Sequence, residues 1–464
     1  MTTIENRTFD EIRIGESASL SRRLTKEDIE LFAVMSGDVN PVCVDAEFAR
    51  DDMFHKLIAH GMWSAALIST ALGTELPGAG AIYRSQTLNF RHPVTLGDTV
   101  VVTVTVREKN AVNQCVVLDC RIINEDGTVV IDGTAEVIAP SMKVRRDRIV
   151  LPEVHLENRG AWHRRLIAQA QDRDPIRTAV VNPTDAVSLI GAVEAAKAKL
   201  IVPILIGPSD VIKATAISSG IDISGYELVP VASPELAAAQ AVEMALAGTA
   251  EVLMKGALHT DVLMHAVVAG EHNLRTERRV SHVFVMDVPT YPRPLFITDA
   301  AINIYPDLET KRDIVQNAID LAHALGIERP KVAILSAVET VNPKIKSTVD
   351  AAELCKMADR GQITGAILDG PLAFDNAVSA DAAKIKHIVS PVAGQADIML
   401  VPDLEAGNML AKQLEYLAGA EGAGIVLGAR VPIVLTSRAD KTLARLASCA
   451  VALLLAHHRR KSAP

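Results

Sequence analysis

A serine, an arginine and an aspartate follow directly after an apolar segment late in the chain. Ser437, Arg438 and Asp440 come after the strand-like run 431–435 and before the helix-like run 441–455. A hydroxyl, a guanidinium and the N–H groups of a helix start would then meet at one place, and such groups bind a phosphate dianion. The alternative is a helix cap with one surface arginine, and the spacing alone leaves both interpretations open.

A second set of residues could carry out proton transfer. Asp38 lies in the loop GDVNP, residues 37–41, and His60-Gly61 opens a strongly apolar helix-like run. A carboxylate can act as a base, and a glycine at a helix start leaves N–H groups that can hold an oxyanion. This pair suits the addition of water to a conjugated thioester. Taken alone, the loop also fits ordinary turn chemistry, and a histidine at a helix start is often structural.

Further polar residues stand beside glycines and prolines at the ends of predicted strands. Ligands bind at the carboxyl ends of parallel strands, so we expect these side chains to help form a substrate-binding mouth. Each of them, taken singly, also fits a plain loop. They are Lys255, Asp369, Asn376, Ser390 and Asn408.

The composition of the 464 residues narrows the class of protein. The chain is 49% apolar but only 3% aromatic, which is typical of cytosolic α/β enzymes with buried parallel strands. A net charge of −9 argues against electrostatic binding of nucleic acid. Five cysteines without a CxxC pair predict neither a disulfide framework nor a metal site.

The ends of the sequence predict where the protein resides. The polar, acidic start lacks the basic and apolar regions of a signal peptide. The apolar run 446–456 is too short to cross a bilayer and is expected to form a buried helix. We therefore expect a cytoplasmic protein that binds no membrane.

The pattern of the chain changes near Pro140. Before it, the alternating segments 99–106, 115–123 and 129–138 predict an antiparallel sheet, and the apolar helix 61–72 must be buried against that sheet. After residue 173, short apolar strands alternate with helices, which predicts a mostly parallel, doubly wound sheet. The strands are expected at 178–181, 201–206, 250–254, 282–286, 331–335, 365–368, 398–401 and 431–435.

Residues 32–98 resemble the MaoC-type (R)-specific enoyl-CoA hydratases, a family with the hot-dog fold. The matching motifs are SGDVNP (36–41), DAEF (45–48), IAHGM (58–62), LPG (76–78), IY (82–83), LNF (88–90), PV (93–94) and GD (97–98). The resemblance implies that Asp38 is catalytic and that Gly61 supplies an oxyanion N–H. Cys43 stands where the family has its catalytic histidine. A thiol accepts hydrogen bonds weakly, so we expect hydratase activity to be weakened or lost while acyl-CoA binding survives.

Two residues of this first domain are expected near the acyl group. The position of Cys43 places it beside the substrate, and Ser69 lies on the apolar helix that the fold turns inward. For Ser69, simple helix packing is an equally good interpretation. The main alternative for the whole domain is that it serves only as an acyl-CoA-binding or oligomerisation module.

Residues 178–455 resemble the phosphate acetyl/butyryltransferases, and the butyryltransferase branch most. The matching motifs are LMKG (253–256), DGPLAFDNAV (369–378), SPVAGQAD (390–397), VPDLEAGN (401–408) and VLTSRAD (434–440). The resemblance implies a two-domain α/β fold with an active cleft and reversible transfer of an acyl group between phosphate and coenzyme A. It also implies no tightly bound cofactor and a homo-oligomer. Ser437 and Arg438 match the phosphate-holding pair, and Asp440 is the nearby candidate for the acid that acts on the thiol.

The predicted fold class is thus an α+β hot-dog domain followed by a two-subdomain α/β acyltransferase domain. The predicted limits are 1–140 for the first domain, 141–173 for a linker with an exposed helix, and 174–464 for the second domain, with subdomains 174–272 plus 430–464 and 273–429. A dehydrogenase of related architecture would need a GxGxxG motif after a strand, and the sequence shows none.

Overall fold

The computed structural model describes residues 3–152, 154, 156, 159–270, 273–435 and 440–462. The chain divides into two compact units, 1–156 and 157–464. Each unit has its own apolar core.

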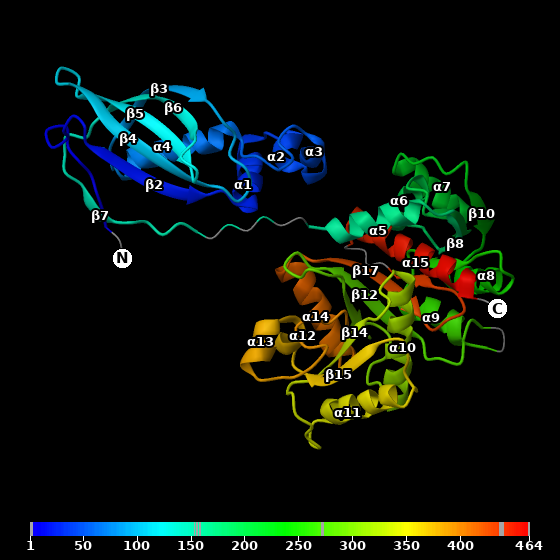
Figure 1. Ribbon diagram of the computed structural model, residues 1–464. Helices are drawn as coiled ribbons and strands as arrows, with labels where there is room; N and C mark the ends of the chain where they lie inside the picture. The colour runs from blue at the N-terminus through cyan, green and yellow to red at the C-terminus, as the bar shows by residue number, and fades with distance from the viewer. Residues whose placement is uncertain are drawn as a thin grey trace. The chain divides into compact units, whose positions relative to one another are not determined.

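Alternation of side chains builds the sheet of the first unit. In β4 (Thr99–Asn110) Val100, Val102 and Val104 are buried, while the residues between them face the other side. Five antiparallel strands follow the order β2-β4-β5-β6-β3. The sheet curves around α4 (Gly61–Thr74), whose Ile68, Ala71 and Leu72 are buried (Figure 1). This is the predicted hot-dog arrangement.

The remaining elements of the first unit are β1 (Thr3–Glu5), β2 (Ser17–Arg23), α1 (Lys26–Ser36), α2 (Pro41–Val44), α3 (Ala46–Asp51), β3 (Ile82–Phe90), β5 (Cys115–Asn124), β6 (Val129–Ile138) and β7 (Arg145–Asp147).

The second unit is organised around one sheet of eleven strands, in the order β10-β9-β8-β11-β18-β17-β12-β13-β16-β14-β15. Strands β10, β9, β8, β11 and β18 run parallel to one another, and so do β13, β16, β14 and β15. The direction reverses where β17 pairs antiparallel with β18. The strands of the two groups therefore run in opposite directions, and their carboxyl ends lie at opposite ends of the sheet along the strand direction.

Among the described residues the strands of this unit are β8 (Ile176–Val181), β9 (Ile201–Gly207), β10 (Glu227–Pro230), β11 (Val252–Lys255), β12 (Ser281–Asp287), β13 (Leu295–Thr298), β14 (Lys331–Leu335), β15 (Ile367–Leu372), β16 (Ile398–Leu400), β17 (Glu421–Leu427) and β18 (Ile433–Val434). The helices are α5 (Ala161–Gln171), α6 (Ala186–Lys197), α7 (Ser209–Ser218), α8 (Pro234–Leu246), α9 (Thr260–Val268), α10 (Leu308–Ala324), α11 (Lys346–Asp359), α12 (Phe374–Val378), α13 (Ala380–Ile385), α14 (Leu404–Leu417) and α15 (Thr442–Ser462).

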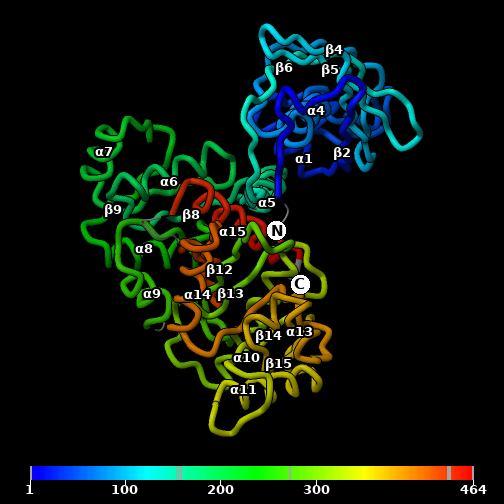
Figure 2. The backbone as a smooth tube through the Cα atoms, turned by 90° about the vertical axis from the view of Figure 1, so that its left-hand side faces the viewer, coloured from blue at the N-terminus to red at the C-terminus, as the bar shows by residue number. Residues whose placement is uncertain are grey.

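Helix α15 is the apolar helix that the sequence predicted to be buried. Its residues 447–456 are almost completely enclosed, and it lies beside α5 and α6 (Figure 2). Helix α5 corrects one expectation, because its Leu166 and Ala170 are buried. The helix predicted to be exposed within 141–173 therefore packs one face against the second unit's core.

The predicted fold class is confirmed in both parts. Within the described ranges, no helix is long and apolar enough to cross a membrane. The domain and subdomain limits predicted from the sequence remain predictions.

Candidate functional site

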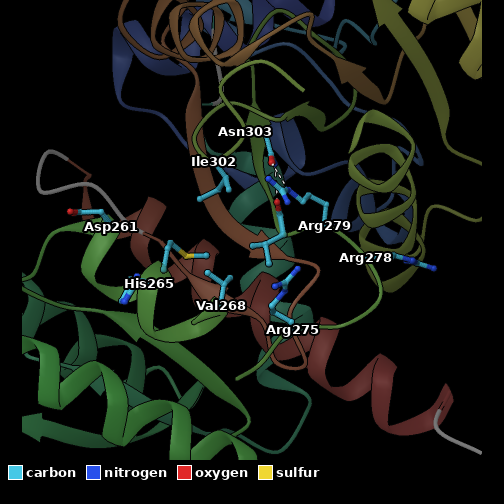
Figure 3. Close-up of a pocket in the computed structure, with 10 residues that line it drawn as sticks. Asp261, His265, Val268, Arg275, Arg278, Arg279, Ile302 and Asn303 are labelled. Atoms are coloured by element: carbon cyan, nitrogen blue, oxygen red, sulfur yellow. Dashed lines mark hydrogen bonds between the residues drawn. The ribbon is translucent and has the colours of Figure 1, made fainter. Parts of the chain in front are cut away.

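A basic cavity of about 440 Å³ opens in the second unit between three chain segments (Figure 3). The segments are helix α9, the stretch that leads into β12, and the turn that follows β13. Its lining residues are Asp261, Met264, His265, Val268, Arg275, Arg278, Arg279, Val280, Ile302 and Asn303.

Helical periodicity decides which residues of α9 face the cavity. Leu263 and Val267, four residues apart, are buried and fix the inner face of the helix. Asp261, His265 and Val268 follow the same spacing on the opposite, exposed face. One side of α9 thus holds the helix to the core, and the other side presents an imidazole and a carboxylate to the cavity.

A buried carboxylate shapes the turn after β13. Asp299, only 2% exposed, accepts hydrogen bonds from the backbone N–H groups of Ala301 (2.9 Å), Ile302 (3.0 Å) and Asn303 (3.2 Å). The Asn303 side chain donates to the same carboxylate at 2.6 Å and to the carbonyl of Val280 at 2.8 Å. Burial raises the pKa of Asp299, and these hydrogen bonds oppose that rise. The turn is thereby fixed against the segment before β12.

Arg279 is held at three points. Its backbone N–H donates to Asp313 at 2.9 Å, and its carbonyl accepts from the Asn317 side chain at 2.9 Å. Its guanidinium Nε donates to Asn303 Oδ1 at 3.3 Å (Figure 3). Because backbone and side chain are both anchored, this positive charge stays in place without a bound ligand. A positively charged group fixed in advance binds an anion at a lower entropic cost.

The cavity is positive in a protein whose net charge is negative. Arg275 and Arg279 contribute two guanidinium groups, the Arg278 guanidinium pairs with Asp320 outside this cavity, and Asp261 is the only carboxylate among the ten lining residues. Guanidinium groups bind phosphate oxygens in a forked geometry. Within the described part of the chain no group of three or more His, Cys, Asp or Glu side chains could hold a metal ion.

The strongest pair predicted from the sequence, Ser437 and Arg438, lies outside the described residues. The structure does show how the chain reaches them. Strand β18 lies beside β11, and Val434 is paired with Met254, the residue before Lys255. Leu435, the last described residue before 436, therefore lies at the same end of the sheet as Lys255. At its other end, the carbonyl of Asp440 accepts a hydrogen bond from Arg445.

The other predicted binding residues occupy separate places. The Asp369 carboxylate accepts from the N–H of Gly370 at 2.8 Å, within β15. Asn376 is fully buried and donates to Glu339. Ser390 caps its own turn, and the Asn408 side chain donates to the carbonyl of Ala300 at 3.3 Å.

The structure does not bring the described members of the predicted set into the basic cavity. Lys255 lies in β11 and Asp369 lies in β15. These strands belong to the two groups that run in opposite directions, so no single end of the sheet carries both side chains. Asn408 comes closest, because it contacts the turn that also positions Asn303. The arginines that line the cavity were missed. The run RTERR at 275–279 was the available signal, since three arginines in five residues directly precede a buried strand.

The first unit has a smaller cavity of about 270 Å³ next to the start of α4. Gly61 lines it, together with Ser64, Phe90 and His92. A Cβ on Gly61 would lie 3.2 Å from the Phe90 ring, so a larger residue would crowd the space. Ser69 is exposed on α4 and is not among the residues that line this cavity, whereas Ser64 lines it from the same helix; a place for Ser69 in the acyl pocket remains a prediction.

The structure brings Asp38 and Cys43 close together. Cys43 is 3% exposed on α2, and burial raises the pKa of its thiol, with a further contribution from the negative charge of Asp38. His60 is buried and donates from Nε2 to the carbonyl of Asp38 at 2.9 Å. This hydrogen bond fixes the loop backbone and leaves the Asp38 carboxylate exposed. Burial and the nearby carboxylate thus both favour the protonated form of the Cys43 thiol.

Two family models match the chain. The model "Phosphate acetyl/butaryl transferase" matches residues 234–453, and the model "MaoC like domain" matches residues 11–125. A phosphate acetyltransferase of Rhizobium meliloti is 62% identical over 296 residues, which cover 64% of this chain and 94% of the relative. A phosphate butyryltransferase of Clostridium acetobutylicum is 42% identical, covering 63% of this chain and 98% of the relative.

A solved structure, a branched-chain phosphotransacylase from Enterococcus faecalis, is 31% identical with a TM-score of 0.54. The match covers 61% of this chain and 99% of that chain. The chain belongs to the phosphate acetyl/butyryltransferase family. More particularly, it carries a MaoC-like domain ahead of the transferase, which confirms the fusion predicted from the sequence.

Proposed function

We propose that the second unit transfers a short acyl group reversibly between coenzyme A and phosphate. Two observations carry the proposal: the chain leads into Ser437 and Arg438 after the carboxyl end of β18, beside Lys255, and the basic cavity with its anchored Arg279, toward the opposite end of β12, offers a second place for an anionic group of the substrates. Phosphate, acyl phosphate and coenzyme A are all anions, so a site rich in fixed guanidinium groups suits both substrates of the reaction. Family membership and the similarity to acetyl- and butyryltransferases support the same activity.

In the proposed mechanism the acyl group moves directly between sulfur and oxygen. Asp440 takes the proton from the coenzyme A thiol, and the thiolate forms a bond to the carbonyl carbon of the acyl phosphate. The bond from that carbon to the phosphate oxygen then breaks, and phosphate leaves with the bonding electron pair. Ser437 and Arg438 hold the phosphate, and positive charge stabilises the tetrahedral oxyanion.

Binding roles for the remaining predicted residues are part of the same proposal. Lys255 lies beside the carboxyl end of β18 and would bring a positive charge to the phosphate. Asn408 supports the turn of the basic cavity. Asp369, Asn376 and Ser390 would act on the substrate only through the loops that they stabilise.

Release of thiol from acetyl- and butyryl-CoA in phosphate buffer tests the proposed activity and its chain-length preference. We expect Arg438→Ala to lose most of the acyl transfer while the protein stays folded. Arg177→Gln is a matched control, because Arg177 is an exposed arginine paired with Glu227 at 2.9 Å. Normal turnover by Arg438→Ala would contradict the assignment.

For the first unit, we propose acyl-CoA binding with little or no hydratase turnover. The cavity beside Gly61 and the exposed Asp38 carboxylate are present, but Cys43 is a buried thiol with a raised pKa. A thiol in this state neither accepts a proton from water nor orients it as an imidazole does. The domain then keeps a place for an acyl thioester without the second half of a catalytic pair.

Loss of crotonyl-CoA absorbance on hydration decides between binding and catalysis. We expect slow or undetectable hydration by the unaltered protein and a gain of activity in Cys43→His. Cys120→Ser is a control, because Cys120 is another buried cysteine of the same unit. Equal, rapid hydration by the unaltered protein and Cys43→His would refute the impaired-hydratase proposal.

We further propose a homo-oligomer that assembles through the first unit. Strand β3 ends the order of the sheet, and its Ile82 (61% exposed) and Phe90 (54% exposed) are large apolar residues at that edge. An edge strand with exposed apolar side chains can pair with a second copy. Light scattering of the full chain and of Ile82→Lys tests this, and a monomeric unaltered protein would refute it.

A further inference from the structure

Two adjoining cavities lie beside the end of α15, and nothing in the proposed reaction uses them. Their volumes are about 280 and 410 Å³. They share the lining residues Arg278, Asn317, Asp320 and Arg459. We refer to them together as the α15 cavity. Helix α10 supplies Asn317 and Asp320, and the stretch 428–430 after β17 closes one side.

Guanidinium groups outnumber carboxylates in the α15 cavity. Arg278, Arg430 and Arg459 line it, against Glu277 and Asp320. Figure 3 shows Arg278 directed away from the other arginines of the first cavity. The α15 cavity is therefore a separate positive site at the back of the segment that carries Arg279.

The Asp320 carboxylate in this cavity already has partners for both of its oxygens. One oxygen of Asp320 pairs with Arg278, and the other accepts from the Gln316 amide at 3.0 Å. Within the described ranges no ion pair reaches Arg430 or Arg459. Among these residues, two guanidinium groups thus remain without a carboxylate partner.

Arg459 is fixed in place by backbone oxygens. Its Nη1 donates to the carbonyls of Ala429 and Arg430, each at 3.2 Å. Burial lowers the pKa of Arg459; the negative charge of Asp320 opposes this effect and the positive charge of Arg278 adds to it. The site therefore keeps a half-buried positive charge that an added dianion would stabilise.

We propose that the α15 cavity binds a phosphate dianion through Arg430 and Arg459. The forked guanidinium matches phosphate oxygens, and the Asn317 amide and the carboxylates at the rim limit the space to a small anionic group. Two sources carry this chemistry in the proposed reaction: free phosphate, and the 3′-phosphate of coenzyme A. The identity of the source rests on the proposed function, whereas anion binding does not.

Calorimetric titration of the full chain with inorganic phosphate, coenzyme A and dephospho-coenzyme A tests the proposal without requiring turnover. Removal of one hydrogen bond between charged groups weakens binding by roughly tenfold or more. If the ligand is the 3′-phosphate, coenzyme A binds at least about tenfold more tightly than dephospho-coenzyme A, and Arg430→Gln removes that difference. If it is free phosphate, Arg430→Gln weakens phosphate binding by about tenfold and leaves the two coenzymes equal.

Arg459→Gln should repeat the result, but removing its two hydrogen bonds to backbone carbonyls can also disturb folding. Arg430→Gln avoids this difficulty, since Arg430 is exposed and, in the part of the chain that the structure describes, its side chain forms no ion pair. Arg460→Gln is the control: it is the next residue on α15, and its guanidinium pairs with Glu251 instead. Unchanged titrations with all three probes in Arg430→Gln and in folded Arg459→Gln would overturn the proposal. Acyl transfer by Arg430→Gln at saturating substrate separates this result from a failure of the proposed function.

Discussion

Replacing Arg279 by glutamine should impair acyl transfer far more than it destabilises the fold. The two anchors of the backbone, Asp313 and the Asn317 amide, remain, because they bind the N–H and the carbonyl. Within the protein, the substitution removes the hydrogen bond from the guanidinium Nε to Asn303 at 3.3 Å. One such bond contributes about 1 kcal/mol, so the free energy of unfolding should fall by that amount or less.

We expect the effect on catalysis to be larger, because in the proposed function the guanidinium is the part of Arg279 that binds the substrate. A hydrogen bond between charged groups contributes about 1.5–3 kcal/mol, which corresponds to a loss of roughly 10- to 150-fold in kcat/KM. Arg279→Lys keeps the charge but not the forked geometry, so its kcat/KM should fall between those of the unaltered protein and Arg279→Gln.

Steady-state thiol release at varied phosphate and coenzyme A gives the two KM values and kcat. Chemical denaturation of the same samples gives the free energy of unfolding. Arg177→Gln, at an exposed ion pair, is expected to match the unaltered protein in both measurements. If Arg279→Gln keeps normal KM values and kcat, Arg279 does not contact the substrate, and the basic cavity is not the active site.

Two further predictions concern buried titratable side chains. His282 is fully buried, which lowers its pKa to about 3, so the unfolded chain takes up a proton near pH 6.5 before the folded chain does. The contribution of neutral His282 to the free energy of unfolding is complete above pH 6.5, and it falls by about 1.4 kcal/mol per pH unit between pH 6.5 and pH 3. His282→Phe should flatten this slope when the free energy of unfolding is measured between about pH 7 and pH 4. Asp350 is buried against Lys311 at 2.7 Å, so Asp350→Asn should cost about 3 kcal/mol by leaving that ammonium unpaired. The exposed Lys346 binds the same carboxylate at 2.8 Å, and Lys346→Met should cost less than about 1 kcal/mol; equal costs would contradict this account.

Side-chain alternation and apolar runs made much of the fold predictable. Strand β4 and helix α4 follow directly from the period of their buried residues, and the alternation of strands and helices indicated the parallel sheet. Strand β17 was missed because its sequence, EGAGIVL, contains two glycines and looks like a loop. Gly424 is needed there, since a Cβ would lie 2.5 Å from the carbonyl oxygen of Leu435. A close approach of this kind cannot be inferred before the neighbouring strand is known.

The site was harder to predict than the fold. Ser437 and Arg438 were found from a motif at a strand end, and their roles remain predictions. Arg279 carried no such motif, and its importance depends on Asn303, which lies 24 residues later in the chain. The two meet only because the buried Asp299 folds the intervening turn back onto the strand. Contacts between segments of this separation are set by the tertiary fold, and no local pattern reveals them.

The shortness of β18 has a mechanical consequence. Among the described residues, this strand of two residues links β11 to β17 in the sheet, and it forms two residue pairs with each. Torsion between the strands on its two sides would therefore be concentrated at Ile433 and Val434, while the longer β8–β11 and β12–β17 ladders stay intact. Helix α15 packs on β11, β18 and β17, and thus on both sides of this link. Ser437 and Arg438 follow Val434 by three and four residues in the sequence, so the shortest strand of the described sheet is also the one that leads to the predicted phosphate-holding pair.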